Sequence, residues 1–197
     1  MHLLFDIDGV LIHSAINIEA KLKTQGFVGS YPEFLQRLFA DEEYNLTLLG
    51  QADIHAVMTR VLKESQQTLS ADAVMEAWGP QPCRSNDALI NRLGEFKCSS
   101  LSLASNQDPV RGHSIHARFS PISAIDQVFL SCDLSVRKPH AEYFEHILTV
   151  LDAPPTDVFF VDDSKPNVET AASLGITAHH FTDNPTLFDH LAELEVI

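Results

Sequence analysis

Two aspartates stand one residue apart near the start of the chain, where the apolar run Leu3-Leu4-Phe5 leads into Asp6-Ile7-Asp8-Gly9. In an extended strand, residues two apart project from the same side, so the two carboxylates would lie close together. Burying two like charges is costly unless a cation lies between them or one of them carries a proton. The pair therefore indicates either a catalytic or metal-binding site or an exposed strand end that leads into an Asp-Gly turn.

Polar side chains also follow two later apolar runs. Ser105-Asn106 come after Leu101–Ala104, and Asp162-Asp163-Ser164 come after Val158–Val161. Apolar runs with little alternation are typical of strands that are covered on both faces, as in a parallel sheet. The expected strands are Leu3–Ile7, Leu101–Ala104, Gln127–Leu130, Val158–Val161 and Ile176–Phe181.

Helical patterns separate the later strands. His140–Leu151 carries apolar residues at helical spacing behind Pro139, and Asn167–Leu174 stops at Gly175, a residue type that often ends helices. Strands and helices that alternate in this way predict a doubly wound, Rossmann-like α/β core around a parallel sheet. Functional groups of that fold gather at the carboxyl ends of the strands, which is where the polar residues occur.

The first half of the chain contains a segment with a purely helical pattern. Ser30-Tyr31-Pro32-Glu33 is a capping box that opens a helix over residues 31–39, a second apolar stripe covers residues 54–62, and Ser70 begins a shorter helix. We predict an all-helical cap of about four helices, inserted between the first two strands of the core. The predicted boundaries are 13–84 for the cap, and 1–12 together with 85–197 for the core.

Inside this cap we expect the aromatic side chains of residues 31–39 to pack in the cap core. Asp41-Glu42-Glu43 is expected to form a solvated turn. The hinges between cap and core are expected around His13-Ser14 and at Gln81-Pro82.

Composition and charge narrow the class of protein. The chain has 197 residues and a formal net charge of −14, which would repel nucleic-acid phosphates and anionic lipids. A phosphate substrate would need a local cation to bind in this field.

Three cysteines, Cys83, Cys98 and Cys132, follow no ligand or disulfide pattern. With no membrane-spanning run and no basic leader, we expect a cytoplasmic protein that binds neither nucleic acid nor membrane; nothing in the sequence indicates its oligomeric state.

Four fragments together resemble a known family. Asp6-Ile7-Asp8-Gly9, Ala104-Ser105-Asn106, Arg137-Lys138-Pro139 and Phe159–Ser164 are similar, in order and spacing, to the four motifs of the haloacid dehalogenase superfamily. The resemblance is closest to the branch with a helical cap after the first motif, and within it to the glucose-1-phosphate phosphatase and epoxide-hydrolase N-terminal-domain group. It implies a Mg²⁺-dependent phosphatase of small phosphorylated metabolites, such as sugar phosphates, that works through an aspartyl-phosphate intermediate.

The resemblance also implies a role for each acidic residue. Asp6 would be the nucleophile that forms an acyl phosphate. Asp6, the backbone carbonyl of Asp8 and Asp163 would hold Mg²⁺, and Asp162 would act on the metal directly or through water. The physical reason is that carboxylates so close together repel each other and the substrate, and a divalent ion with oxygen ligands removes that repulsion.

Asp8 and three polar residues would complete the chemistry. The Asp8 side chain would protonate the leaving alkoxide and then deprotonate the attacking water. For this Asp8 needs a raised pKa, while the neighbouring Asp6 must stay ionised. Dehalogenases of the family lack an aspartate here, so Asp8 favours phosphoryl transfer. Ser105 and the Asn106 amide would bind phosphoryl oxygens, although Ser105 is also suited to capping a helix. Lys138 would supply a fixed positive charge.

Substrate specificity is less well defined by the sequence. The candidates lie near the cap hinge and its facing loops: His13, Ser14, Tyr44, Asn45 and Arg60. Asn167 stands where many family members have another carboxylate, and we expect it to orient Asp162 or Asp163.

Three other functions compete with a phosphatase. A phosphoglucomutase-like phosphotransferase would need a second phosphate site in the cap, whose bases form no cluster in the sequence. A 2-haloacid dehalogenase is disfavoured by Asp8. A catalytically silent binding module is disfavoured by the intact set Asp6, Asp8, Lys138 and Asp163.

Overall fold

A five-stranded parallel sheet forms the core of the computed structural model, which describes residues 1–13, 18–78 and 84–197. The strand order is β5-β4-β1-β6-β7. The strands are β1 (His2–Phe5), β4 (Ser100–Ser105), β5 (Gln127–Leu130), β6 (Val158–Asp162) and β7 (Thr177–His180). The predicted doubly wound α/β core is confirmed.

The first strand is shorter than predicted. It ends at Phe5, because the chain beyond it curls into a tight loop in which Leu11 and Ile12 both donate their backbone N–H to the carbonyl of Ile7. Asp6 still donates its own N–H to Val161 of the neighbouring strand over 2.8 Å. Asp6 is therefore held at the carboxyl edge of the sheet while Asp8 lies in the loop beyond it.

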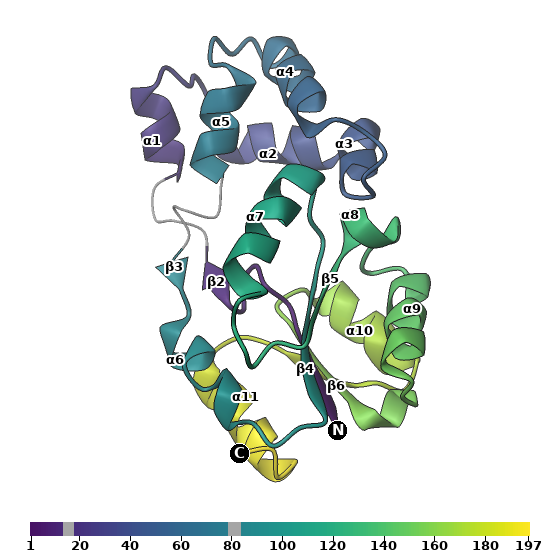
Figure 1. Cartoon of the computed structure of the whole chain (residues 1–197). Helices are drawn as coiled ribbons and strands as arrows, with labels where there is room; N and C mark the ends of the chain where they lie inside the picture. Colours follow the sequence, from purple (N-terminus) through teal and green to yellow (C-terminus); the bar gives the residue numbers. More distant parts are fainter. Residues whose placement is uncertain (14–17, 79–83) are drawn as a thin grey trace.

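Helices cover both faces of the sheet (Figure 1). The helices α7 (Pro109–Phe119) and α11 (Asn184–Glu193) pack on the face that carries Leu3 and Phe5. The helices α9 (Ala141–Leu151) and α10 (Lys165–Ser173) pack on the face that carries Leu4. Residues on both sides of the central strands β1, β4 and β6 are thus buried, which explains the nearly continuous apolar runs in the sequence. Short helices complete the core: α6 (Asp87–Ile90), η1 (Leu93–Glu95), α8 (Ser131–Leu134) and η2 (Pro155–Asp157).

An all-helical cap lies above the end of the sheet where the strands finish (Figure 1). Its two connections to the core pair as short antiparallel strands, β2 (Ile12–His13) and β3 (Arg84–Ser85). The expected hinge residues Ser14, Gln81 and Pro82 lie outside the described residues. The described part of the cap has five helices, one more than expected: α1 (Ile18–Thr24), α2 (Tyr31–Phe39), α3 (Glu42–Thr47), α4 (Ile54–Glu64) and α5 (Ala71–Trp78).

The additional helix, α3, begins where a solvated turn was expected. Asp41 caps it, since its carboxylate accepts a hydrogen bond from the backbone N–H of Tyr44 over 3.0 Å. Asp41 also forms an ion pair with Arg60 of α4. The acidic run Asp41-Glu42-Glu43 therefore starts a helix, because an aspartate N-cap followed by acidic residues suits the positive end of a helix.

The aromatic stripe of α2 is divided between two environments. Phe34 is buried in the cap core with Leu38 and with residues of α4 and α5. Tyr31 is only half-buried, and Phe39 is 51% exposed. The expectation that all these aromatics form cap core is therefore wrong for Phe39 and only partly right for Tyr31. Within the described residues, no helix combines the length and apolarity needed to cross a bilayer.

Candidate active site

Side chains from four segments meet at the carboxyl edge of the sheet. Asp6 follows β1, Ser105 ends β4 and Asp162 ends β6, so their positions follow from β1 lying between β4 and β6. Lys138 reaches the same place from the loop before α9. A polar cavity of about 380 Å³ opens here, lined by Asp6, Asp8, Gly9, His13, Ser105, Asn106, Lys138, Asp163, Ser164 and Asn167.

Lys138 is the buried cation of this cluster, with only 1% of its surface exposed. Its ammonium group lies 2.9 Å from Asp6 Oδ1 and 2.6 Å from Asp162 Oδ2, and it donates to the Ala104 carbonyl over 2.8 Å. Burial alone would lower the pKa of Lys138, but the two carboxylates raise it, so the group stays charged. All three ammonium protons are used by the protein. Lys138 therefore offers the cavity its charge rather than a free N–H.

Asn106 holds the loop that carries Lys138. Its side-chain Nδ2 donates to the Lys138 carbonyl over 2.8 Å, and its Oδ1 accepts from the Lys138 backbone N–H over 2.9 Å. Both ends of the Asn106 amide side chain are thus occupied. This pairing fixes the Asn106 side chain against the loop that carries Lys138.

Asp162 is fully buried and saturated with hydrogen bonds. Its Oδ1 accepts from the Ser164 N–H at 2.8 Å and from Asn167 Nδ2 at 3.0 Å. Its Oδ2 accepts from Lys138 and from Asn167 Nδ2. With two donors on each oxygen, little capacity remains for a metal ion. Asp162 therefore positions Lys138, and Asn167 orients Asp162 as the sequence predicted.

Asp6 presents one carboxylate oxygen to the cavity. Its Oδ1 accepts from the Ile7 N–H over 2.7 Å and contacts Lys138, whereas no residue in the described ranges donates a hydrogen bond to Oδ2. Burial raises the pKa of Asp6 well above its usual value, Lys138 opposes this rise, and the charge of Asp162 adds to it. The single positive charge of Lys138 therefore does not neutralise the negative charges of both Asp6 and Asp162.

Asp163 completes a group of three carboxylates. Oxygen atoms of Asp6, Asp162 and Asp163 lie within 4.8 Å of one another. Burial, followed by the charge of Asp162, raises the pKa of Asp163. Gly9, at φ +82°, lies against Asp163 so closely that a Cβ would collide with its carboxylate. An anionic set of oxygen ligands with one lysine suits a hard divalent cation such as Mg²⁺, so these residues fit the predicted metal.

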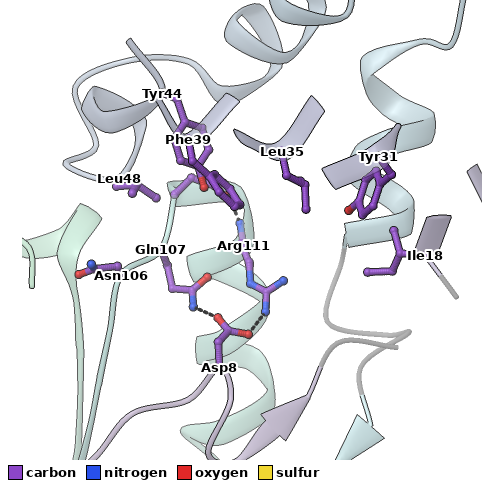
Figure 2. A pocket seen from close by; sticks show the side chains of 11 residues that line it. Asp8, Ile18, Tyr31, Leu35, Phe39, Tyr44, Leu48, Asn106, Gln107 and Arg111 are labelled. Atoms are coloured by element: carbon purple, nitrogen blue, oxygen red, sulfur yellow. Dashed lines mark hydrogen bonds and ion pairs between the residues drawn. The ribbon is translucent and has the colours of Figure 1, made fainter. Parts of the chain in front are cut away.

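Asp8 lines both the polar cavity and a second cavity. Its carboxylate is not among the three grouped carboxylates; it accepts a hydrogen bond from Gln107 Nε2 over 2.6 Å and forms an ion pair with Arg111 (Figure 2). Gln107 Nε2 also donates to Ser105 Oγ over 2.9 Å. The two aspartates of the first loop therefore have different partners: Asp6 faces Lys138, and Asp8 faces Gln107 and Arg111.

The sequence reasoning missed Gln107 and Arg111. Gln107 directly follows Ser105-Asn106, so its proximity to the site could have been inferred. Asp108 and Pro109 form an N-cap and first-turn pair, and Asp108 Oδ1 accepts the N–H of Arg111 over 3.1 Å. That capping signal predicts a helix start, which would have placed Arg111 in the first turn beside the site.

The second cavity lies between cap and core and has a volume of about 240 Å³. Two of the specificity candidates line a cavity: His13 the polar one and Tyr44 the second one. Ser14 lies outside the described residues. Asn45 and Arg60 line neither cavity, because Asn45 bonds to the Asp41 carbonyl and Arg60 pairs with Asp41 and Glu43.

The basic residues of the cap are also distributed away from the site. Lys21 pairs with Glu76 and Lys23 with Glu19, and both pairs lie on the surface. No lysine or arginine in the described part of the cap lines either cavity. A second phosphate group, as a mutase would require, has no cationic partner on these described cap walls.

The family comparison decides the class of this protein. A family model described as haloacid dehalogenase-like hydrolase matches residues 1–175, which is most of the chain. The chain belongs to the haloacid dehalogenase-like hydrolases. This hydrolase shares its fold with a family enzyme of Bacteroides thetaiotaomicron, with a TM-score of 0.76 and 21% identity over 95% of this chain and 97% of that one. The Bacteroides enzyme has also been crystallised with magnesium and inorganic phosphate.

Two curated relatives match the hydrolase over short segments. A sesquiterpene phosphatase of Aspergillus oryzae is 37% identical over 59 residues, which is 30% of this chain and 30% of that protein. A drimenol cyclase of Aspergillus calidoustus is 41% identical over 51 residues, which is 26% of this chain and 10% of that protein. The matched segments span less than a third of either relative.

Proposed function

We propose that this hydrolase is a Mg²⁺-dependent phosphatase of small phosphomonoesters, with Asp6 as the nucleophile. The observation that carries the proposal is the arrangement of Asp6: one oxygen is fixed by Lys138 and the Ile7 N–H, and the other is directed to a polar cavity beside Asp163. A carboxylate held in this way can attack phosphorus and form an acyl phosphate.

The reaction divides into two steps that conserve the protons. Asp6 Oδ2 attacks the phosphorus atom, the ester P–O bond breaks, and Asp8 gives its proton to the departing oxygen. Asp8 then removes a proton from water as the water attacks the acyl phosphate, which releases phosphate and restores Asp6. The position of Asp8 in the lining of both cavities supports this role.

The remaining residues bind and neutralise the phosphoryl group. Asp6, Asp163 and the backbone carbonyl of Asp8 would hold Mg²⁺, whose charge offsets the repulsion between the carboxylates and the phosphate. Ser105 Oγ and the Asn106 N–H would donate to phosphoryl oxygens, and Lys138 adds its charge in a buried site. Asp162 acts through Lys138.

The comparisons support phosphatase activity over dehalogenation. The Aspergillus oryzae relative is named as a phosphatase, and the Bacteroides enzyme binds magnesium and inorganic phosphate in its crystals. Dehalogenases share the fold, and an L-2-haloacid dehalogenase of Xanthobacter autotrophicus is similar with a TM-score of 0.66 at 18% identity, over all of this chain and 84% of that one. A halide needs no proton to leave, so the paired Asp8 would have no purpose in that reaction.

Metal removal tests the proposed activity directly. We expect hydrolysis of para-nitrophenyl phosphate in the presence of Mg²⁺, loss of at least about 99% of the rate with excess EDTA, and recovery on adding Mg²⁺, because the carboxylates then repel the phosphate. Halide release from 2-chloropropionate is measured in parallel. Halide release without phosphatase activity would reject the proposal.

Replacement of Asp8 separates its two roles. We expect Asp8→Asn to slow the hydrolysis of alkyl phosphates by about a hundredfold to a thousandfold, because an alkoxide leaves poorly without a proton. Para-nitrophenolate leaves without protonation, so the variant should release about one equivalent of it per active site in a burst and then stall at the acyl phosphate. Stopped-flow absorbance measures the burst.

The control for this variant is Asp189→Asn, which changes an exposed aspartate of α11 far along the chain. It should keep the rate of the unmodified protein. Equal slowing of both ester classes by Asp8→Asn, without a burst, would contradict the acid–base role.

A further inference from the structure

The cavity between cap and core has one apolar wall and one polar wall. Six cap side chains from α1 to α3 and the turn after α3 form the apolar wall: Ile18, Tyr31, Leu35, Phe39, Tyr44 and Leu48. Figure 2 shows these side chains above Asp8, which lies between Gln107 and Arg111. Asp8 and Asn106 also line the polar cavity, so the two cavities adjoin at the proposed general acid.

Part of the polar wall is already engaged in hydrogen bonds within the protein. The carboxylate of Asp8 is paired with Gln107 and Arg111, and both ends of the Asn106 side chain bond to the Lys138 backbone. Asp108 caps α7 through the N–H groups of Val110 and Arg111. The hydroxyl groups of a polar leaving group would have to compete with these bonds, and each buried hydroxyl without a partner opposes binding.

An apolar leaving group carries no hydroxyl groups that need partners in the cavity. It would bury its carbon atoms mainly against the cap side chains and would itself bring few polar groups out of water, and apolar burial is the main favourable term in such a site. An apolar cavity of about 150 Å³ holds one benzene ring, so 240 Å³ corresponds to about ten carbon atoms.

We infer that the cavity between cap and core binds the alcohol part of the substrate, and that this alcohol is an apolar aliphatic chain of about ten carbon atoms. The inference rests on the proposed phosphatase function and names its substrate class. The phosphate occupies the polar cavity, the ester oxygen lies beside Asp8, and the chain lies against Leu35 and its neighbours. Cleavage of the P–O bond yields the free alcohol after Asp8 donates its proton. This substrate class differs from the sugar phosphates that the sequence suggested.

A series of primary alkyl phosphates tests the substrate class. Phosphate release is measured with Mg²⁺ for ethyl, butyl, octyl and decyl phosphate, below their micelle concentrations, and for glucose 6-phosphate. We expect kcat/KM to rise by up to about fourfold per added methylene and to level off near ten carbons. Glucose 6-phosphate should be at least about a hundredfold poorer than octyl phosphate. A rate that does not depend on chain length, or a preference for the sugar phosphate, would overturn the inference.

Calorimetry separates failure of the inference from failure of the phosphatase function. Binding of octyl phosphate and of glucose 6-phosphate is measured on the Asp6→Asn variant, in which turnover plays no part. If the intact protein hydrolyses no ester but octyl phosphate binds at least about tenfold more tightly, the apolar site stands and the proposed activity fails. Equal binding of the two ligands overturns the apolar site whether or not esters are hydrolysed.

Variants of Leu35 test whether the preference for long alkyl phosphates depends on the apolar wall of the cavity. Leu35 is half-buried on α2, and Leu46, which is 40% exposed on α3 and lines neither cavity, supplies a matched control. Leu35→Asn should lower the ratio of octyl to ethyl phosphate kcat/KM by about tenfold, whereas Leu46→Asn should leave it unchanged. Leu35→Phe should move the optimum to shorter chains by filling space, and it decides the matter if the asparagine variant does not fold. Wild-type ratios in every Leu35 variant would overturn the inference.

Discussion

Replacing Asp6 with asparagine is expected to lower kcat by about 10⁴-fold or more, which is the scale seen when a covalent nucleophile is removed. The amide is nearly the same size as the carboxylate but does not attack phosphorus. Asp6 is buried, and burial raises its pKa, so the neutral side chain should be tolerated and the fold retained. Steady-state hydrolysis of para-nitrophenyl phosphate with Mg²⁺ measures the rate, and thermal unfolding measures the fold.

The covalent intermediate gives a second measurement for the same variant. Rapid acid quenching during turnover, followed by mass spectrometry, should find one phosphoryl group on the peptide that contains Asp6 and none in the Asp6→Asn variant. Asp189→Asn, the exposed control, should carry the label as the unmodified protein does. If Asp6→Asn retained more than about a hundredth of the activity, water rather than Asp6 would be the attacking group.

Replacing Lys138 with methionine is expected to reduce both stability and activity. Lys138 is the cation that lies between the carboxylates of Asp6 and Asp162, and all three groups are buried. Removing one partner of a buried charged cluster typically costs about 3–5 kcal/mol of unfolding free energy, because the remaining charges are uncompensated. The rate should fall by about a thousandfold, the scale of losing an electrostatic contact at the reacting group. Urea unfolding and kcat are the two measurements.

A double variant separates the structural effect of Lys138 from its catalytic effect. Adding Asp162→Asn to Lys138→Met removes one uncompensated charge and should restore part of the unfolding free energy without restoring kcat. Lys165→Met serves as the surface control, because Lys165 pairs with Glu169 at 3.6 Å and both side chains are largely exposed. Exposed pairs contribute about 0–1 kcal/mol. Wild-type stability in Lys138→Met would refute the proposed role of the buried cluster.

The pairing of Asp8 with Arg111 gives Asp8, the proposed acid and base, different surroundings from Asp6, the proposed nucleophile. Asp6 is buried against a lysine, whereas the Asp8 side chain is 46% exposed and lines both cavities. A side chain that exchanges protons with a departing oxygen and then with water needs such access. The structure thus separates two aspartates only one residue apart by giving them different neighbours.

Much of the fold and the proposed nucleophile side of the site could be predicted from the sequence. Buried parallel strands appear as apolar runs, and their carboxyl ends must share one edge of the sheet. Polar residues that follow those runs, such as Asp6, Ser105 and Asp162, therefore had to come close together. The helix pattern of the cap was equally readable from its apolar spacing, although the N-cap role of Asp41 was not recognised.

Only the tertiary structure decided the leaving-group side. Helical periodicity puts Phe34 and Phe39, five residues apart, toward opposite edges of the apolar stripe of α2, but which edge meets the cap core and which lines the cavity depends on how the cap is oriented. The partners of Asp8 come from the loop and first turn of α7, about a hundred residues away along the chain. Local spacing determines which side chains share a face of an element, whereas contacts between distant elements depend on packing that no local pattern records.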